Sequence, residues 1–264
     1  MKKTILLFSA LLIFGNLSAQ DKAALVNPII GTNGMGHTFP GACVPFGLVQ
    51  LSPDTDTIPH NVDGKYQPRA YEYCAGYQHK DSSIVGFSHT HFSGTGHSDL
   101  GDILIMPATG ELKLNPGTAT DPDGGYRSRF SHDTEVSRPG YYEVMLADYG
   151  VKAQLTATKR VGVHKYTFPK EAKNQRIILD MIHGIYNYDG KVLWTNIRVE
   201  NDTLVTGYRI TNGWARTNYT YLAMSFSKPV VHYGCEEKAK VNYRGGYGKF
   251  NMKENFPDIG GRKI

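Results

Sequence analysis

A chain of 264 residues that is 40% hydrophobic and 20% charged has an ordinary globular composition, long enough for one large domain or two small ones. Its formal net charge of +5 is mild and its lysines and arginines are scattered, which argues against nucleic acid as a partner. Three cysteines, Cys43, Cys74 and Cys235, are too few for a disulfide framework, so we expect one disulfide at most.

Residues 1–19 have the pattern of a secretory signal peptide. Lys2 and Lys3 form a positive segment, residues 5–14 are apolar, and Leu17-Ser18-Ala19 offers a cleavage site with small residues. The apolar run is too short to cross a bilayer, and no later segment resembles a membrane span. We therefore expect a mature chain that is periplasmic or secreted.

The clearest structural signal lies in residues 140–233. Tyr142, Val144 and Leu146 alternate with polar neighbours, and the same period of two continues in later segments rich in Val, Ile, Tyr and Thr. The predicted strands are 142–146, 151–157, 160–168, 176–181, 191–200, 203–211 and 218–227. Asn201-Asp202 and Tyr188-Asp189-Gly190 are typical of hairpin turns. Many short strands at regular spacing predict an all-β fold, an antiparallel β-sandwich.

The first half of the chain has a different character. Between Asn27 and Pro107, Gly, His, Pro, Asp and Ser are dense and the apolar alternation is broken. Three stretches stand out, Gly31–Gly41, Tyr71–Tyr77 and Gly86–Asp102. Loops that carry many polar and aromatic groups are where functional sites tend to lie, so we expect the site here.

The stretch Gly86–Asp102 contains His89, His91 and His97. A His-x-His pair on a strand places both imidazoles on one face, and His97 could complete a three-ligand zinc site. No Cys or Glu completes a familiar metal spacing, and histidines in such loops also commonly bond to backbone or substrate hydroxyls. Zinc is the weaker interpretation, and each of His89 and His91 is about as well explained as a buried core histidine.

The glycine-rich stretch Gly31–Gly41 does not fit a phosphate-binding loop. Such a loop needs a helix after it, and Phe39-Pro40-Gly41 blocks one. We expect instead a backbone loop that approaches a ligand, with His37 as a hydrogen-bond donor. The alternative is a tight structural turn.

Tyr71, Tyr73 and Tyr77 place three aromatic rings within seven residues. Sugars present apolar C–H faces, so an aromatic platform with polar groups nearby suits carbohydrate. Alternate tyrosines on a strand also commonly pack against their own sheet. Both interpretations stay open for Tyr71 and Tyr73.

No catalytic residue can be assigned from these patterns. Ser88 and Ser93 flank histidines, but the chain has no Gly-x-Ser-x-Gly elbow. A pair of carboxylates for glycoside hydrolysis is defined by its separation in space, which the sequence does not show. The available carboxylates are Asp54, Glu72, Asp81, Asp99 and Asp102, with no pattern that selects one.

Taken together, several ordered blocks resemble one family. They are Val26-Asn-Pro-Ile-Ile-Gly31-Thr, His37-Thr-Phe-Pro-Gly-Ala, Val44-Pro-Phe-Gly-Leu-Val-Gln-Leu-Ser-Pro-Asp54-Thr, Cys74-Ala-Gly-Tyr77, Gly86-Phe-Ser-His-Thr-His-Phe-Ser-Gly-Thr-Gly96, Asp99-Leu-Gly-Asp-Ile-Leu-Ile-Met-Pro107, Pro139-Gly-Tyr-Tyr142, Leu155-Thr-Ala-Thr158, Arg160-Val-Gly-Val-His-Lys-Tyr-Thr-Phe168 and Gly213-Trp-Ala-Arg216. From about Leu25 to its end, the chain resembles the N-terminal part of glycoside hydrolase family 92, the calcium-dependent exo-α-mannosidases.

The resemblance implies that residues 20–264 form a supersandwich-like β-sandwich domain, C-terminally truncated and without the α/α helical barrel of full-length members. Such enzymes remove terminal mannose from glycans, N-glycans included, by inversion. Their catalytic carboxylates and most of the Ca²⁺ ligands lie on the helical domain, so we expect no catalytic residue and no metal ligand here. The implied sugar-binding residues are His37, Tyr71, Tyr73, Cys74, His89 and His91. The chain departs from the family where Tyr71 and Tyr73 replace the usual tryptophans, which bears on the preferred linkage.

We therefore expect a mannose-containing glycan and the chain's own C-terminal helical domain as partners, with the fragment inactive alone. Two rival hypotheses remain. One is a free-standing carbohydrate-binding β-sandwich protein that uses Tyr71, Tyr73 and the histidine loop. The other is a small zinc hydrolase centred on His89, His91 and His97.

Overall fold

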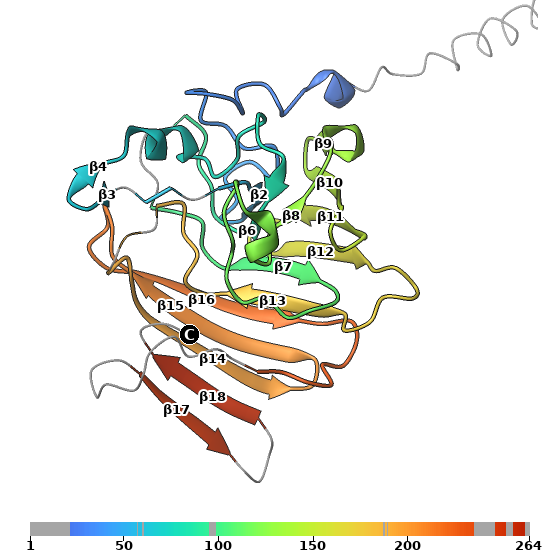
Figure 1. The fold of residues 1–264 in the computed structure, drawn as a ribbon, viewed down its shortest axis with the longest axis vertical. Coiled ribbons are helices and arrows are strands. Elements are labelled where there is room, and N and C mark those ends of the chain that lie inside the picture. Colours follow the sequence, from blue (N-terminus) through green and yellow to red (C-terminus); the bar gives the residue numbers. More distant parts are fainter. Residues whose placement is uncertain are drawn as a thin grey trace, which may run out of the picture.

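The computed structural model describes residues 22–234 except 57, 60, 95–98, 187 and 189, together with the backbone of two strands at 246–251 and 256–261. Regular structure in this part is almost entirely antiparallel β (Figure 1), as expected. Short 3₁₀ helices interrupt the strands; they are η1 (Lys22–Leu25), η2 (Pro68–Tyr73), η3 (Pro122–Gly124) and η4 (His132–Thr134). Among the described helices, none is long and apolar enough to cross a membrane.

Three sheets make up the fold. The first has the order β1 (Ala42–Cys43), β2 (Gln50–Asp54), β6 (Gly86–Ser88), β7 (Leu104–Ala108) and β13 (Arg176–Asp180). The second has the order β12 (Gly162–Thr167), β11 (Val151–Ala157), β10 (Tyr141–Leu146) and β9 (Val136–Arg138). The third has the order β16 (Asn218–Ser225), β15 (Leu204–Thr211), β14 (Val192–Asn201), β18 (Phe256–Gly261) and β17 (Gly246–Asn251). Two two-stranded sheets complete the described strands: the hairpin β3 (Asn61–Val62) with β4 (Lys65–Tyr66), and the pair β5 (Ser83–Ile84) with β8 (Ser128–Arg129).

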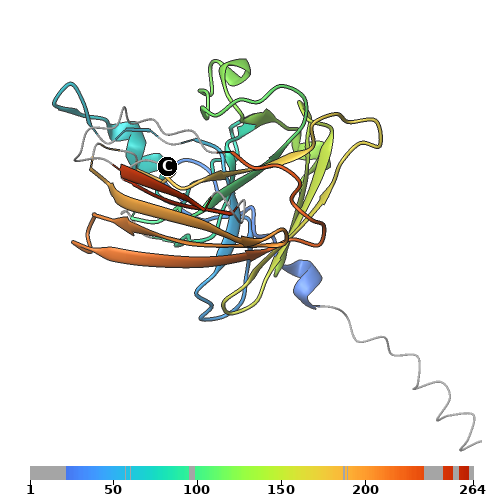
Figure 2. The same cartoon turned by 90° about the horizontal axis from the view of Figure 1, so that it is seen from below.

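The main hydrophobic core lies between the first two sheets. Strands β1 and β2 contact β11, and one apolar cluster takes side chains from both sheets. Tyr142, Val144 and Leu146 are buried as their alternation predicts, while the residues between them are partly exposed. Figure 2 shows the sheet β9–β12 and the sheet β14–β16 as separate layers. The first and second sheets thus pack together as a sandwich, because each buries its apolar face against the other.

The predicted strands of residues 140–233 are all present, with bounds that differ by a few residues at most. The turn at Asn201-Asp202 does join the hairpin β14–β15. The hairpin predicted at Tyr188-Asp189-Gly190 is wrong, although Asp189 itself lies outside the described residues. Strand β13 pairs with β7 and β14 pairs with β15, so this segment crosses between two sheets.

A second correction concerns the tyrosine stretch. Tyr71 and Tyr73 lie in η2, which begins at Pro68, and not on a strand. A 3₁₀ helix has three residues per turn, so positions two apart point in different directions. Tyr71 is accordingly exposed while Tyr73 is buried.

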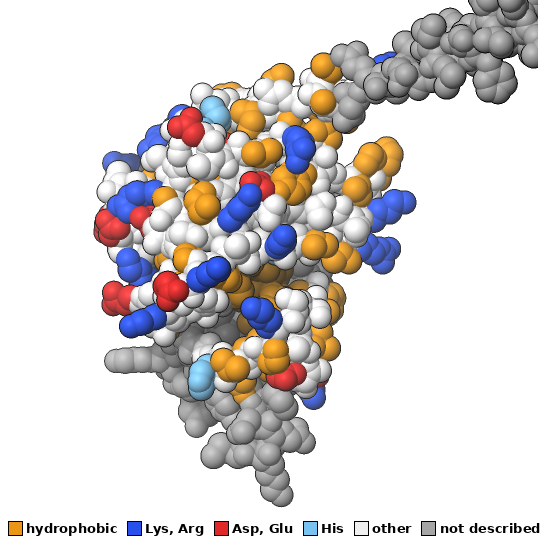
Figure 3. All heavy atoms as spheres, turned by 90° about the vertical axis from the view of Figure 1, so that its right-hand side faces the viewer, with side chains coloured by type: hydrophobic (Ala, Val, Ile, Leu, Met, Phe, Trp, Pro, Cys, Tyr) orange, Lys and Arg blue, Asp and Glu red, His pale blue; other side chains and the backbone are white. Residues whose placement is uncertain are grey.

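The side chains on the surface are mixed in type. Figure 3 shows lysine and arginine side chains dispersed over one face among apolar and acidic ones. On that face no single charge type gathers over one part of the fold.

We expect Leu146→Ala to lower the free energy of unfolding by about 2–5 kcal/mol, because the fully buried side chain leaves a cavity between the sheets. Val163→Ala on β12, whose side chain is exposed, serves as the matched control and should cost less than about 1 kcal/mol. Urea unfolding followed by circular dichroism measures both. Equal losses in the two variants would contradict this placement of the core.

Candidate functional site

The three polar stretches of the first half meet in space. The backbone N–H of Gly94 donates to the carbonyl of His37 at 2.7 Å, which joins the first and third stretches. Gln78, directly after the second stretch, exchanges two hydrogen bonds with the backbone of Gly34, at 2.7 and 2.9 Å. The rings of His37 and Tyr71 lie edge to face with centroids 4.8 Å apart. Loops distant in sequence therefore form one continuous region.

His37 has a buried ring nitrogen that could bind a ligand. Its backbone adopts a left-handed φ of 50°, and its side chain is buried, with 7% of the residue exposed. Among the described residues, its Nε2 has no hydrogen-bond partner. A buried polar atom without a partner is costly, so it commonly marks a place where a ligand or water completes the bond.

Tyr71 lies beside this nitrogen and is 38% exposed. The loop is held tightly, since a Cβ on Gly36 would lie only 2.1 Å from the carbonyl oxygen of Gly31. A fixed imidazole nitrogen next to an exposed aromatic ring can bind one hydroxyl and one C–H face of a sugar. Of the six predicted sugar-binding residues, these two have the geometry for direct contact.

Tyr73 and Cys74 are buried and have partners within the protein. The Tyr73 hydroxyl donates to the Asp81 carboxylate at 3.0 Å, and the Cys74 sulfur lies 3.4 Å from the Tyr186 hydroxyl. Burial raises the pKa of both the Tyr73 hydroxyl and the Cys74 thiol. Cys74 and Cys43 are free thiols, and Cys235 lies outside the described residues. The roles of Tyr73 and Cys74 in sugar binding stay predictions.

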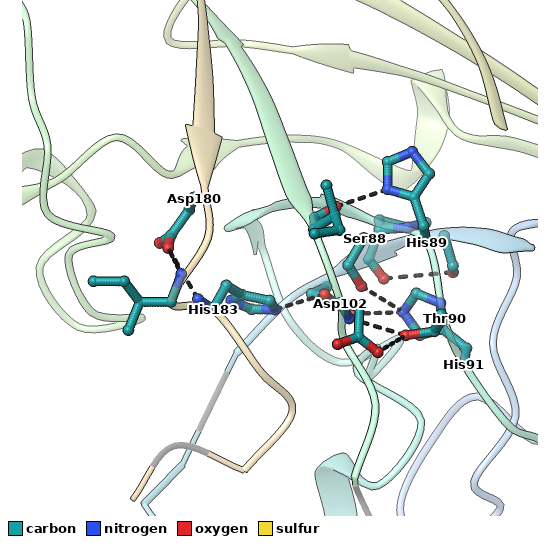
Figure 4. Close-up of polar contacts among 12 residues, drawn as sticks. Ser88, His89, Thr90, His91, Asp102, Asp180 and His183 are labelled. Atoms are coloured by element: carbon teal, nitrogen blue, oxygen red, sulfur yellow. Dashed lines mark hydrogen bonds and ion pairs between the residues drawn. The ribbon is translucent and has the colours of Figure 1, made fainter. Parts of the chain in front are cut away.

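His91 is fully buried and bonded at both ring nitrogens (Figure 4). Its Nδ1 lies 2.8 Å from the carbonyl oxygen of Gln50, and its Nε2 lies 2.8 Å from Oδ1 of Asp54. A carbonyl and an ionised carboxylate only accept hydrogen bonds, so the ring N–H groups of His91 are the donors in these contacts. The Ser88 hydroxyl is 3.2 Å from the same Nε2. A nucleophilic triad would place Ser and Asp on opposite nitrogens, so this arrangement is not one.

Asp54, at the end of β2, is the centre of this network. Its second oxygen, Oδ2, accepts from Nε2 of His183 at 2.7 Å. Burial alone would raise the pKa of this carboxyl, but the attraction of His91 and hydrogen bonds from both histidines hold the pKa well below its usual range. Gly76 passes so close that a Cβ there would lie 2.0 Å from Oδ1. Asp180 orients His183 by accepting from its backbone N–H at 2.9 Å (Figure 4).

His89 belongs to a different chain of hydrogen bonds. Its Nδ1 donates to the carbonyl of Ile103 at 2.7 Å, so its Nε2 must accept from Nε2 of His164 at 3.0 Å. The Tyr166 hydroxyl then donates to Nδ1 of His164 at 2.7 Å. Burial lowers the pKa of both imidazoles, which fits two neutral rings.

The pairing of His89 and His91 on one face was predicted for a strand, but β6 ends at Ser88 and the two rings have separate partners. The described residues therefore do not bring them to a common metal position. His97, the third ligand of the zinc hypothesis, lies outside the described residues.

A second buried ion pair lies behind the first network. The Arg209 Nε is 2.8 Å from Oδ1 of Asp102. The two groups form an ion pair, but their geometry is not that of a hydrogen bond. Arg209 Nη1 also donates to the carbonyls of Met181 and His183, at 3.2 and 2.5 Å. Burial, reinforced by Arg209, lowers the pKa of the neighbouring Lys191 to about 8.

Sequence reasoning did not single out Asp54, His183 or Arg209. Asp54 and His183 are 129 positions apart, and no local pattern connects them. A signal for Arg209 was present, since a charged residue interrupts an otherwise apolar and uncharged strand at 204–211. A buried arginine needs a partner, and that requirement points to a carboxylate elsewhere in the fold.

Comparisons with known proteins agree with this architecture. Residues 25–258 match the sequence profile of the glycosyl hydrolase family 92 N-terminal domain. Among solved structures, the chain is similar to the family GH92 α-mannosidase from Bacteroides thetaiotaomicron in complex with mannoimidazole, with a TM-score of 0.72 and 37% identity over 92% of this chain. It is also 30% identical over 158 residues, 56% of its length, to an uncharacterized secreted glycosidase of Arthroderma benhamiae.

A further GH92 family glycosyl hydrolase shares the fold, with a TM-score of 0.63 at 24% identity over 91% of this chain and 30% of its own. The chain spans only part of these relatives, 30% of the bacterial α-mannosidase and 18% of the fungal glycosidase. The family match nevertheless covers most of the described residues and agrees with the sandwich and its strands. The chain belongs to glycosyl hydrolase family 92, whose N-terminal domain it matches over residues 25–258.

Proposed function

We propose that this chain is the domain that forms part of the sugar pocket in a secreted, calcium-dependent, inverting exo-α-mannosidase that acts on mannose-containing glycans such as N-glycans. The observation that carries the proposal is the likeness, over 92% of the chain and at 37% identity, to an α-mannosidase in complex with mannoimidazole. The name of the fungal relative, a secreted glycosidase, supports export of the mature chain to the periplasm or beyond.

In this proposal His37 and Tyr71 are the direct sugar contacts of the domain. Nε2 of His37 bonds one sugar hydroxyl, which would supply the partner that this buried atom lacks among the described residues. The exposed ring of Tyr71 packs on a C–H face of a neighbouring sugar. Because both groups are fixed by the loop contacts, they restrict the orientation of the sugar before any reaction.

The catalytic acid and base are proposed to come from the C-terminal helical domain. The carboxylates described around the loops have partners already: buried Asp54 has two histidines, buried Asp102 has Arg209 and Thr90, and partly buried Asp81 has Tyr73. An inverting glycosidase needs two carboxyl groups about 6.5–9.5 Å apart that reach the sugar and a water molecule. Carboxylates occupied in this way fit a supporting role better than a catalytic one.

Calcium is likewise proposed to bind mainly through ligands of the helical domain. Ca²⁺ prefers six to eight oxygen ligands. Among the described residues, the group suited to hold a metal has two imidazoles and one carboxylate, which does not match that preference. When bound in the complete enzyme, calcium would hold mannose hydroxyls and favour distortion of the ring toward the transition state.

Asp54 is proposed as a positioning residue. Its carboxylate, at the end of β2, bonds His91 of the third stretch and also His183. Gly76 of the second stretch packs against the same carboxylate. The loops that carry His37 and Tyr71 are bonded to these same stretches. The buried charges therefore act on the sugar only through the shape of the loops.

We expect the isolated chain to release no mannose from α-linked mannobioses, with or without Ca²⁺. A protein that continues past Ile264 into the helical domain should release it, lose activity with chelator, and give β-mannose as the first product by NMR. Metal-dependent release of mannose by the isolated chain would contradict the proposal that the catalytic groups lie on the helical domain. Calorimetric binding of mannobioses by the chain alone, with no in-frame continuation of its gene, would favour the free-standing carbohydrate-binding protein.

We expect Tyr71→Ala in the complete enzyme to lower kcat/KM about 2- to 10-fold, since an aromatic contact contributes about 0.5–1.5 kcal/mol. Tyr71→Phe keeps the ring and should retain activity within about two-fold. Tyr66→Ala, which changes another exposed tyrosine, on β4, is the control. A large loss in Tyr71→Phe would show that the hydroxyl and not the ring contacts the substrate.

We expect Asp54→Asn to lower the free energy of unfolding by about 3–5 kcal/mol at pH 7, because it leaves buried histidines without their charge partner. The pKa of Asp54 is lower in the folded protein, so its stabilisation is complete above the ordinary carboxyl value near 4 and is lost as the pH falls below it. The difference between wild type and variant should therefore shrink at pH 3 in urea unfolding. Asp123→Asn, which changes an exposed carboxylate paired with Arg129, should alter stability little at either pH. A difference that grows toward low pH would contradict the lowered pKa.

A further inference from the structure

A group of side chains away from His37 and the Asp54 network has the composition of a transition-metal site. It consists of His79, after the tyrosine stretch, His132 in η4, and Glu135 before β9. One ligand atom from each residue lies within 4.8 Å of the others. We propose that His79, His132 and Glu135 bind one Zn²⁺ ion.

The two imidazoles are already arranged around the carboxylate. Nδ1 of His132 lies 2.7 Å from Oε2 of Glu135. Nδ1 of His79 lies 3.4 Å from the Tyr77 hydroxyl, which donates to the same carboxylate at 2.8 Å. The ring centroids of His79 and His132 are only 4.0 Å apart. Two imidazolium rings at this separation would repel each other, whereas one divalent cation accepts a nitrogen from each.

Glu135 is held in place as ligands of structural metals usually are. Its side chain is 3% exposed, and its ion-pair partner among the described residues is His132 and not a lysine or arginine. The hydroxyls of Tyr77 and Tyr142, both buried, donate to it at 2.8 and 2.6 Å. Such hydrogen bonds fix the orientation of a ligating carboxylate and hold it ready for the ion.

His132 provides access from solvent. Its side chain is 38% exposed, and the ring of Phe130 meets it edge to face at 5.0 Å, which limits its rotation. Two nitrogens and one carboxylate oxygen, with water in the fourth position, suit Zn²⁺ far better than Ca²⁺ or Mg²⁺, which prefer oxygen ligands. The partly exposed ring leaves room for that water.

The site would tie together segments that also hold the sugar-binding loops. The backbone N–H of His79 donates to the carbonyl of Thr32 at 2.9 Å, and Gln78 next to it holds Gly34. A metal bound at His79 therefore braces the Gly31–Gly41 stretch against the connection that follows β8. The role is structural, since nothing in the group lies against His37 or Tyr71 in the described contacts.

Zinc binding to metal-stripped protein is the direct test, with a chromophoric chelator as competitor at pH 7.5 and Ca²⁺ and Mg²⁺ as comparison ions. We expect one equivalent of Zn²⁺, a higher thermal midpoint with Zn²⁺ but not with Ca²⁺, and a tetrahedral absorption spectrum when Co²⁺ replaces it. The readouts are stoichiometry, midpoint and spectrum, so they do not depend on mannosidase activity.

His132→Asn and His79→Asn should each weaken Zn²⁺ binding at least about 10-fold, and Tyr142→Phe, which frees the carboxylate from one hydroxyl, by about 10-fold. His132→Asn changes a partly exposed residue and should leave the fold intact. His232→Asn, at an exposed histidine outside the group, is the matched control and should leave Zn²⁺ binding unchanged. Absence of a stoichiometric Zn²⁺, or binding that is lost in His97→Asn and kept in His132→Asn, would overturn the proposal.

Discussion

The arrangement of the loops depends on one buried carboxylate. Asp54 receives an imidazole on each oxygen, His91 on one and His183 on the other, and all three residues are buried. A single buried charge is expensive, and its cost falls only when opposite charges and hydrogen bonds surround it. The fold meets this condition with residues from β2, from the loop after β6, and from the crossover after β13. These segments are therefore fixed relative to one another.

The candidate sugar contacts, His37 and Tyr71, are connected to Asp54 through residues that lie between them. Gly76 lies against the carboxylate because it has no side chain, and η2, just before it, carries Tyr71. The loop of His91 continues to Gly94, whose N–H bonds the carbonyl of His37. Neither His37 nor Tyr71 touches Asp54 in the described contacts. The buried charges thus set the shape of the loops, whereas His37 and Tyr71 are the side chains proposed to contact the sugar.

Much of the sandwich could be predicted from sequence because its information is local. Tyr142, Val144 and Leu146 show their burial through alternation alone, and the family resemblance of the first half pointed to the correct stretches. Two predictions were wrong because a local pattern is compatible with more than one structure. A turn at 188–190 is compatible with a hairpin or with a crossover, and only the pairing of β13 with β7 decides it. Likewise, Tyr71 and Tyr73 alternate as in a strand, but Pro68 starts a 3₁₀ helix that separates them.

The site itself was less predictable, because its contacts join positions far apart. The sequence marks His89 and His91 as candidates for buried, hydrogen-bonded histidines, but their partners His164 and Asp54 are too distant in sequence for any local pattern to identify them. His79 and His132 were not selected at all, since 53 positions of unrelated sequence separate them. Spacing reveals a metal site when its ligands follow a familiar short-range pattern, and these two histidines do not. Here the fold assembles them.

The distance in sequence between Asp54 and His183, 129 positions, also has a consequence for how the protein folds. Closing so long a loop costs chain entropy before any contact compensates for it. The contact forms only when the segments of β2 and β13 have come together, so we expect the loops around Asp54 to become ordered late in folding. The same topology opposes local fraying, because releasing these loops requires that the sheet itself separate. The loops that carry His37 and Tyr71 should therefore unfold only together with the core, in one cooperative step.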